Sequence, residues 1–375
     1  MATAPSLPSP LETLVLQAIA GNGGWIGFER FMELALYTPG LGYYTRDSAQ
    51  FGNMPAGVDG SGSDFVTAPQ MSPFFGRAFA VQVAQALRET GTREIWEFGA
   101  GSGALALELL DALGDHVDRY TIVDLSGALR QRQRETLQVH EAKLHWADSL
   151  PATMHGVVLG NEVLDAMPVK LLVRKSGAWH ERGVTTGNGD AFMWEDRPTD
   201  LRPPLAIAGE HDYLTEVHTV AEGFVRTLAE RLARGAAFFL DYGFPEREYY
   251  HDQRSSGTVM CHQAHRMDGE PLADVGNKDI TAHVNFTGLA LAAQETAQGA
   301  AANDFGVLGY TSQARFLMNC GLLPLLENAS LPERTMAQKL LMEHEMGELF
   351  KVIGFFKGAP WEAIGFSQGD RTHTL

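Results

Sequence analysis

Short apolar runs alternate with helical stretches between residues 93 and 241 of the chain. The runs are of strand length, and they lie at residues 94–98, 120–124, 143–146, 157–160 and 236–240. In the stretch after the first run, leucines recur at helical spacing, at Leu105, Leu109 and Leu113. This alternation is typical of a mainly parallel sheet with helices on both faces. The sequence therefore predicts an α/β fold for this part of the chain.

Two insertions interrupt the predicted core. Residues 170–215 begin with period-two alternation around a Gly187-Asn188-Gly189 turn signal, which predicts an inserted β-meander. Residues 244–305 have no dominant period, so we interpret them as a second, mixed insertion with a helix near residues 287–298. Both insertions follow predicted strands of the sheet.

The remaining segments give the domain organisation. A helix is expected at residues 308–322, and residues 323–326 would pair with residues 350–357 to complete a seven-stranded sheet. The predicted order is a disordered tail at 1–10, a helical cap and loop at 11–75, a core at 76–358 and a C-terminal tail at 359–375.

Charge and composition limit the function classes. Acidic residues outnumber basic ones, 46 to 29, and the net charge of -17 argues against a nucleic-acid partner. The apolar runs are far shorter than the roughly 20 residues that span a bilayer, so no membrane insertion is expected. The chain has only two cysteines, Cys261 and Cys320, and its first ten residues lack a basic or Arg-rich leader, so we expect a reducing, cytoplasmic location.

The segment Glu97-Phe98-Gly99-Ala100-Gly101-Ser102-Gly103 follows a predicted strand and opens a helix. At such a junction glycines let the backbone approach a ligand, and free N–H groups at the helix start point towards it. Gly99, Gly101 and Ala104 also fit the dinucleotide fingerprint, so a nicotinamide or flavin oxidoreductase is an alternative. A tight structural turn without a ligand is a further alternative.

Three acids at the ends of successive predicted strands limit which class of ligand the cradle can bind. Glu97 would repel a pyrophosphate and suits a cationic amine, and Asp124 is placed to accept ribose hydroxyls. Asp148 could accept from an adenine amino group, although it could also be a solvated loop residue or a helix cap. S-adenosylmethionine carries an amine, a ribose and an adenine, so the sequence predicts it as the cofactor.

An acceptor site is expected near two further strand ends. The segment from Asn161 to Pro168 places Glu162 and Asp165 directly after an apolar strand. Asp241-Tyr242-Gly243 adds another acid and a phenol at the next strand end. Acids at these positions are candidates for handling the acceptor, with capping or burial as the structural alternative.

The chain resembles the MidA family of class I S-adenosylmethionine-dependent methyltransferases, also known as DUF185 or COG1565. Beyond the glycine cradle, the resemblance rests on Gly42–Tyr44, Asp64–Pro69, Phe75-Gly76, Asn161–Pro168, Asp241–Gly243, Asp279–Phe286 and Phe350–Ile353. It implies the Rossmann-like class I methyltransferase fold with an N-terminal helical extension. Because mitochondrial members are arginine methyltransferases needed for respiratory complex I assembly, it also implies a basic protein partner, such as a complex I subunit.

The resemblance assigns roles to individual residues. It implies that Glu162, aided by Asp165 or Asp241, holds the guanidinium, that Asn161 lines the cofactor or orients the acceptor, and that Thr67 helps to close the cleft. This chain departs from the family pattern at three positions. Ser63 stands where the family has a glycine, and Gln70 and Asn285 stand where it has acids. A non-catalytic, cofactor-binding assembly factor is therefore a further alternative. His283 is interpreted as structural, no metal is expected, and a homodimer is left open.

Overall fold

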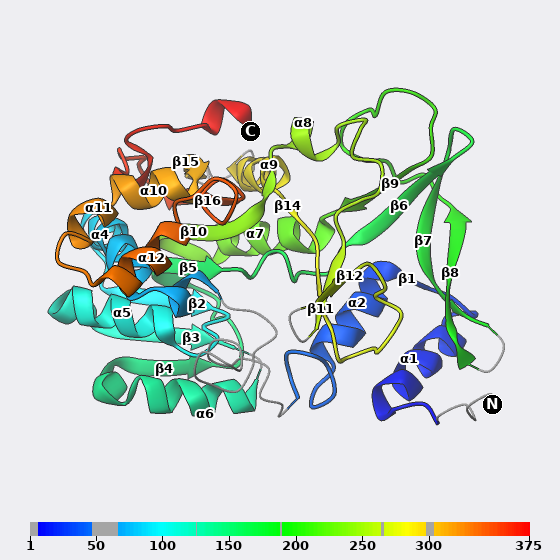
Figure 1. Ribbon diagram of the computed structural model, residues 1–375, viewed down its shortest axis with the longest axis horizontal. Helices are drawn as coiled ribbons and strands as arrows, with labels where there is room; N and C mark the ends of the chain where they lie inside the picture. Colours follow the sequence, from blue (N-terminus) through cyan, green and yellow to red (C-terminus); the bar gives the residue numbers. More distant parts are fainter. Residues whose placement is uncertain (1–6, 47–66, 125, 188–189, 264–265, 298–303) are drawn as a thin grey trace. The chain divides into compact units, whose positions relative to one another are not determined.

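The computed structural model describes residues 7–46, 67–124, 126–187, 190–263, 266–297 and 304–375, which form two compact units from interleaved segments. The sheet unit contains the described residues of Ala49–Asp165, Glu222–Pro245 and Val284–Leu375. The insert unit contains those of Met1–Ser48, Ala166–Ala221 and Glu246–His283. Figure 1 labels the elements of both units.

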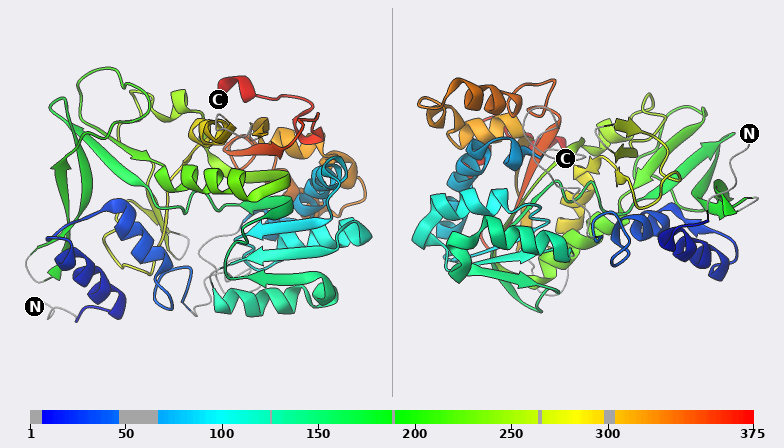
Figure 2. Two further views of the ribbon diagram at one scale, coloured as in Figure 1. Left: turned by 180° about the vertical axis from the view of Figure 1, so that it is seen from behind. Right: turned by 60° about the horizontal axis from the view of Figure 1, so that its bottom comes forward.

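Within the described residues, the sheet unit is built on an eight-stranded sheet of order β15-β16-β10-β5-β2-β3-β4, with β14 beside β10 (Figures 1 and 2). Strands β4, β3, β2, β5 and β10 pair in parallel, whereas β16 is antiparallel to both β10 and β15. The strand bounds are β2 Glu94–Phe98, β3 Arg119–Val123, β4 Leu144–Ala147, β5 Met154–Asn161, β10 Leu232–Phe244, β14 Val284–Asn285, β15 Phe305–Ser312 and β16 Phe350–Lys357.

Helices cover both faces of this sheet, as the alternating pattern predicts. Neighbouring residues of a strand point to opposite faces. Phe238 contacts Phe79 of α4 and Phe239 contacts Phe224 of α7, so these helices lie on opposite faces. The helices of the unit are α3 Ala68–Met71, α4 Pro73–Thr90, α5 Ala104–Leu113, α6 Gly127–Thr136, most of α7 Thr219–Arg231, α9 Phe286–Ala297, α10 Gln313–Asn319, α11 Leu322–Leu325 and α12 Leu331–Lys339.

The antiparallel edge of the sheet differs from the expectation. The start of the helix expected at 308–322 is strand β15, which pairs with β16, and only the later part is helical. The segment expected as a strand at 323–326 instead overlaps helix α11. Gly309 lies against the Phe366 ring, where an added Cβ would come within 2.2 Å, so long-range packing selects the extended conformation over the local helical spacing. Phe366 itself is buried, so the segment expected as a C-terminal tail packs onto the core.

The insert unit contains the predicted β-meander. Strands β1 Ile26–Gly27, β6 Lys170–Lys175, β7 Ala178–Thr186, β8 Phe192–Pro198 and β9 Tyr213–Val217 form one sheet, and β11 Met260–Gln263, β12 Arg266–Asp268 and β13 Asp279–Thr281 form another. Residues 188 and 189 of the predicted turn lie outside the described residues. The second insertion is divided, because its helix α9 belongs to the sheet unit.

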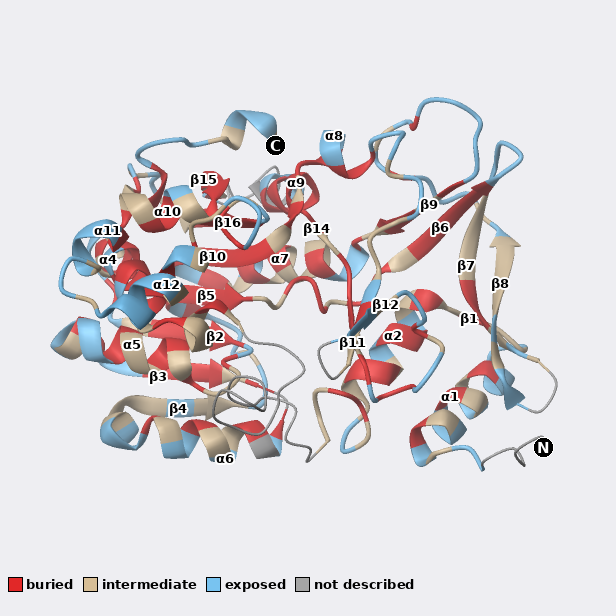
Figure 3. Cartoon of the chain, viewed as in Figure 1, coloured by how far each residue is buried: buried red, intermediate tan, exposed pale blue. Residues whose placement is uncertain are grey.

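The N-terminal helices complete the insert unit. Helix α1 Pro10–Gly21 begins with Ser9 and Glu12 in a reciprocal capping box, and α2 Phe28–Tyr37 follows; the short α8 is Glu246–Tyr249. Phe28 and Phe31 are buried and contact Trp194 and Phe192 of β8. Figure 3 colours the chain by burial and shows buried stretches along α2. The expected tail thus includes the start of α1, while residues 1–6 lie outside the described part. No helix among the described residues has the length and apolar character to cross a membrane.

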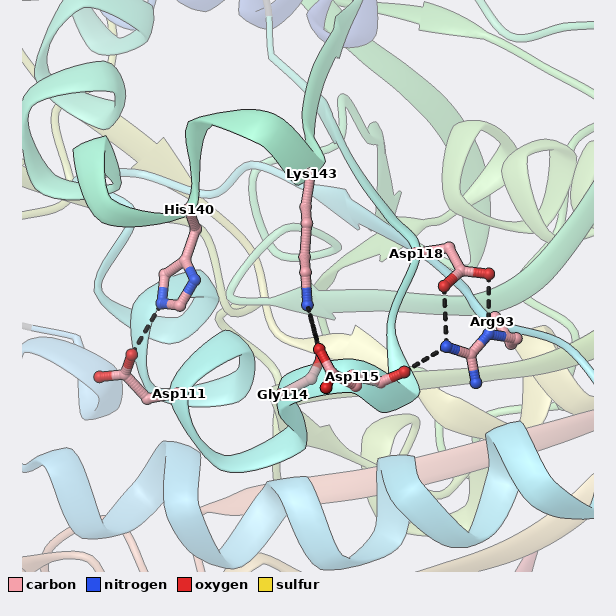
Figure 4. A network of polar contacts seen from close by, with 7 residues as sticks. All are labelled: Arg93, Asp111, Gly114, Asp115, Asp118, His140 and Lys143. Carbon is pink, nitrogen blue, oxygen red and sulfur yellow. Dashed lines mark hydrogen bonds and ion pairs between the residues drawn. The ribbon is translucent and has the colours of Figure 1, made fainter.

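The amino ends of strands β2 and β3 carry a surface ion-pair network (Figure 4). Arg93 donates to Asp118 at 2.7 and 2.8 Å and also bonds the Asp115 carbonyl. Lys143 donates to the Gly114 carbonyl at 2.7 Å. Arg93 lowers the pKa of Asp118, but exposed pairs of this kind add little stability. The network joins elements at the sheet edge opposite the glycine cradle.

Candidate functional site

The glycine cradle joins the end of β2 to the start of α5. Gly99, Gly101 and Gly103 have φ angles of 61°, 53° and 84°, a left-handed region that favours glycine. A Cβ added at Gly99 would lie 3.0 Å from Val163, whereas one at Gly101 would have no atom of the described residues within 4 Å. Gly99 therefore packs against the segment after β5, and Gly101 borders open space where a ligand can approach the backbone.

Glu97 lies on β2, two residues before the cradle. Its side chain is almost fully buried, at 2% exposure, and its Oε2 accepts a 2.8 Å hydrogen bond from the Tyr120 hydroxyl. Burial raises the pKa of Glu97 to about 8, and the nearby Asp124 carboxylate adds to the increase. A cationic ligand group would favour the ionised form of this carboxyl, as the sequence analysis expects for an amine.

Asp124 directly follows β3, the neighbouring strand. Its Oδ1 accepts from the Ser126 N–H at 3.1 Å, and its Oδ2 accepts from Gln133 Nε2 at 2.9 Å. Phe98 pairs with Val123, so Asp124 and Gly99 follow paired residues of adjacent strands. The structure thus brings Asp124, Glu97 and the cradle to one edge of the sheet.

Asp148 lies one residue beyond β4, at the same edge. Its side chain is 84% exposed and forms a 2.6 Å ion pair with Arg130. Arg130 also donates to the backbone carbonyl of Asp124 at 2.9 Å. Asp148 is therefore held by an arginine across the strand ends, and its contact with an adenine stays a prediction.

Asn161 and Glu162 form the tip of β5. Glu162 has a φ of 55°, a conformation that is uncommon for a residue with a side chain, and its N–H donates to the Leu240 carbonyl at 2.8 Å. Asn161 Nδ2 donates to Glu162 Oε1 at 3.0 Å. Asn161 Oδ1 is buried and has no hydrogen-bond partner in the described structure, so it is an acceptor suited to a ligand N–H or O–H.

Asp241 holds the turn that follows β5. Its Oδ2 accepts from the N–H groups of Val163, Leu164 and Asp165 at 3.1, 2.9 and 3.2 Å, and its Oδ1 accepts from the Tyr242 N–H at 3.0 Å. The side chain is completely buried. These contacts indicate that Asp241 positions the turn, and its predicted help in holding the acceptor stays a prediction.

Asp165 is buried beside Tyr242, whose hydroxyl donates to Asp165 Oδ2 at 2.7 Å. Burial, and then the carboxylates of Asp165 and Glu162, raise the pKa of Asp241 well above its usual range. The tips of β5 and β10 thus concentrate three acids, as the sequence analysis expects, and this cluster would attract a cationic group.

The departures from the family pattern have structural consequences at two positions. Gln70 Nε2 donates to Ser102 Oγ at 3.2 Å, so helix α3 lies beside the cradle. Thr67 precedes this helix at the N-cap position, without a side-chain capping hydrogen bond. Asn285 Oδ1 accepts from the Gly288 N–H at 3.2 Å at the start of α9. Asparagine and aspartate serve equally well as helix caps, so Asn285 can replace the acid without losing this contact. Ser63 and residues 64–66 lie outside the described structure.

Sequence reasoning missed Gln133, Tyr120 and Arg130, which contact the predicted acids. The sequence does contain a signal that Gln133 is buried. Leu129, Gln133 and Leu137 follow one another at i, i+4 spacing, and both leucines are buried. His283 belongs to the insert unit, where its backbone N–H donates to Thr258 Oγ1 at 3.1 Å. Among the described residues, no three His, Cys, Asp or Glu side chains form a group that could hold a metal.

The residues at this sheet edge fit S-adenosylmethionine. The open space beside Gly101 allows close approach of a ligand to the backbone, and the buried Glu97 suits an ammonium group. Asp124 supplies carboxylate acceptors for hydroxyls, and Asn161 Oδ1 offers a buried acceptor. Each of these groups belongs to the sheet unit.

Comparison with known proteins gives consistent similarities. Residues 78–304 match a family of S-adenosyl-L-methionine-dependent methyltransferases. A crystal structure of a COG1565 superfamily member from Burkholderia thailandensis bound to S-adenosyl-homocysteine is 46% identical, with a TM-score of 0.89 over 99% of this chain and 100% of that one. The mitochondrial protein arginine methyltransferase NDUFAF7 of Homo sapiens is 26% identical over 86% of this chain and 76% of its own length. Its homolog in Caenorhabditis elegans is 24% identical over 94% and 87%, respectively.

Proposed function

Because the chain belongs to the family of S-adenosyl-L-methionine-dependent methyltransferases, we propose that it methylates an arginine side chain of a protein. The family removes the oxidoreductase alternative that the glycine spacing left open. The observation that carries the arginine proposal is that Glu162 and Asp165 lie together at the tip of β5, in the turn that Asp241 of β10 holds. The names of the mitochondrial relatives agree with it.

In this proposal the two groups of acids have different tasks. Glu97, Asp124 and the backbone of Gly99, Gly101 and Gly103 hold the cofactor, with Asn161 and Thr67 beside it and Asp148 near the adenine. The bound cofactor supplies a methyl group on a positively charged sulfur. The protein then has to align the acceptor nitrogen with that methyl group and exclude other geometries.

The acceptor needs acids because a free guanidinium has a pKa above about 12 and is a poor nucleophile while protonated. Glu162 accepts two guanidinium N–H groups and fixes their plane, as carboxylates do in bidentate pairs. Asn161 orients the Glu162 carboxylate through its 3.0 Å hydrogen bond. Asp165, held by Tyr242, adds negative charge that stabilises the cation and receives the proton that the substituted nitrogen releases.

The partner would be a protein with a basic, arginine-containing segment. The net charge of -17 favours association with such a segment. The family resemblance makes a respiratory complex I subunit the first candidate to test. The same proposal requires no nucleic acid in the complex.

Labelled methyl transfer tests this function. The purified protein and labelled S-adenosylmethionine are added to a lysate from a deletion strain, and mass spectrometry locates the modified residue. We expect label on an arginine, lost with Glu162→Gln while S-adenosyl-homocysteine binding is retained. Label on lysine, RNA or a small molecule would overturn the arginine assignment. Full rescue of the deletion strain by Glu162→Gln would instead favour a non-catalytic assembly role.

A further inference from the structure

Gln133 of helix α6 is completely buried and uses both ends of its side-chain amide. Its Nε2 donates to the Gly101 carbonyl at 3.1 Å and to Asp124 Oδ2 at 2.9 Å. Its Oε1 accepts from the Trp146 indole N–H at 2.9 Å. An indole N–H only donates, and a carbonyl and an ionised carboxylate only accept, so these partners fix the orientation of the amide.

The three partners belong to three successive parts of the sheet edge. Gly101 lies in the cradle after β2, Asp124 follows β3, and Trp146 is on β4. The Gln133 side chain therefore forms hydrogen bonds to all three segments that are expected to contact the amino-acid, ribose and adenine parts of the cofactor. A second link along the same edge comes from Arg130, which bonds the Asp124 carbonyl and Asp148.

We propose that Gln133 is a positioning residue for the cofactor, which fixes the Asp124 carboxylate and the Gly101 peptide in their binding geometry. The amide directs Asp124 Oδ2 through a hydrogen bond to an ionised acceptor, which is stronger than a neutral one. It also fixes the Gly101 peptide by donating to its carbonyl, at a glycine where no atom of the described residues lies within 4 Å of an added Cβ. The inference rests on the cofactor and is independent of the acceptor.

Calorimetric titration of the full chain with S-adenosyl-homocysteine at pH 6 and pH 9 tests the proposal. We expect Gln133→Leu to weaken binding by about 10- to 100-fold relative to the unmodified protein at both pH values, because the charge-assisted bond is lost. Gln133→Glu keeps the shape of the side chain. At pH 9 its carboxylate would repel Asp124, whereas at pH 6 its protonated form has one O–H, which can donate to Asp124 Oδ2 but leaves the Gly101 carbonyl without this donor. The deficit of this variant should therefore narrow at pH 6.

The charged neighbours of the pair are Glu97, Arg130 and Arg134. Each variant is compared with the unmodified protein at the same pH, so that the protonation of Glu97 affects both proteins alike. Gln131→Leu is the matched control, because Gln131 is exposed on the same helix. Thermal unfolding identifies any variant that does not fold, and Gln133→Glu decides the test if Gln133→Leu fails.

Two results would overturn the proposal. Binding by both variants within about twofold of the unmodified protein would show that the cofactor does not need Gln133. A deficit of Gln133→Glu that is equal at pH 6 and pH 9 would show that the residue acts only through packing. Loss of arginine methylation with intact binding would concern the acceptor and leave this inference unchanged.

Discussion

The Tyr120 hydroxyl donates a 2.8 Å hydrogen bond to Oε2 of Glu97, and both side chains are buried within the parallel sheet. The hydrogen bond favours the carboxylate, but the cost of burying charge is larger and raises the pKa of Glu97 to about 8. At neutral pH the ligand-free protein therefore holds a proton on Glu97. An ammonium group beside it would displace that proton.

Binding of S-adenosyl-homocysteine should release protons near pH 7. We expect up to about one proton per site, because most Glu97 carboxyls are protonated before binding and ionised afterwards. Calorimetry in buffers of different ionisation enthalpy measures this number. The release should disappear in Glu97→Gln, and it should fall towards zero above pH 9 in the unmodified protein. Equal release by the variant would show that another group titrates.

Glu97 should also make folding stability depend on pH. Its folded pKa of about 8 exceeds the ordinary 4.5, so between these values the folded protein holds a proton that the unfolded chain has released. Stability from this group is present below pH 4.5 and is lost as pH rises through 8, by at most about 1.4 kcal/mol per pH unit.

Denaturant unfolding between pH 6.5 and 8 measures this effect. Burial lowers the pKa of His218 to about 3, and stability from neutral His218 is lost only as pH falls below 6.5. The chosen window therefore avoids that residue. The free energy of unfolding should fall more steeply with pH in the unmodified protein than in Glu97→Gln. Parallel slopes would contradict the assignment.

Alanine at Gly101 should separate binding from folding. Gly101 and Gly91 have φ angles of 53° and 59°, and at either position an added Cβ would meet none of the described residues within 4 Å. Both substitutions should cost about 1 kcal/mol of stability through backbone strain. Only Gly101→Ala should weaken S-adenosyl-homocysteine binding, by at least about tenfold, since its methyl group enters the ligand space. Equal affinities would place the cofactor elsewhere.

Glycine at position 162 should remove activity without loss of stability. The left-handed φ of 55° at Glu162 is strained, so Glu162→Gly should maintain the free energy of unfolding or raise it by up to about 1 kcal/mol. Methyl transfer should be lost. Ser176→Gly is the control, because Ser176 has a φ of 48° in an exposed hairpin turn. Its activity should stay unchanged, and a large destabilisation of Glu162→Gly would refute the strain argument.

The cradle and the ends of the parallel strands could be predicted because their signals are local. The Glu97–Gly103 segment combines an apolar run, spaced glycines and a helical pattern, and the carboxyl ends of neighbouring parallel strands meet at one edge. The strand at Phe305–Ser312 could not be predicted in this way. Its extended form depends on pairing with β16, some forty residues away in sequence.

The contacts that hold the acids of the site could not be predicted from the local sequence pattern either. Asp241 accepts a hydrogen bond from the Asp165 N–H, although the two residues lie 76 positions apart in the sequence. The positioning role of Asp241 therefore follows only from the pairing of β5 with β10. Asp148 forms an ion pair with Arg130 that its local sequence does not indicate, and its contact with an adenine stays a prediction. Partners of this kind, distant in sequence, influence which acids at a strand end can contact a ligand.

A crystal structure of this protein with S-adenosyl-homocysteine would show whether the ends of β2 and β3 bind the cofactor. We expect the ligand's amino group within hydrogen-bond distance of Glu97, its ribose hydroxyls at Asp124, and its chain along the backbone of Gly99–Gly103. Electron density for the ligand at another part of the fold, or with Glu97 and Asp124 out of contact, would contradict this expectation.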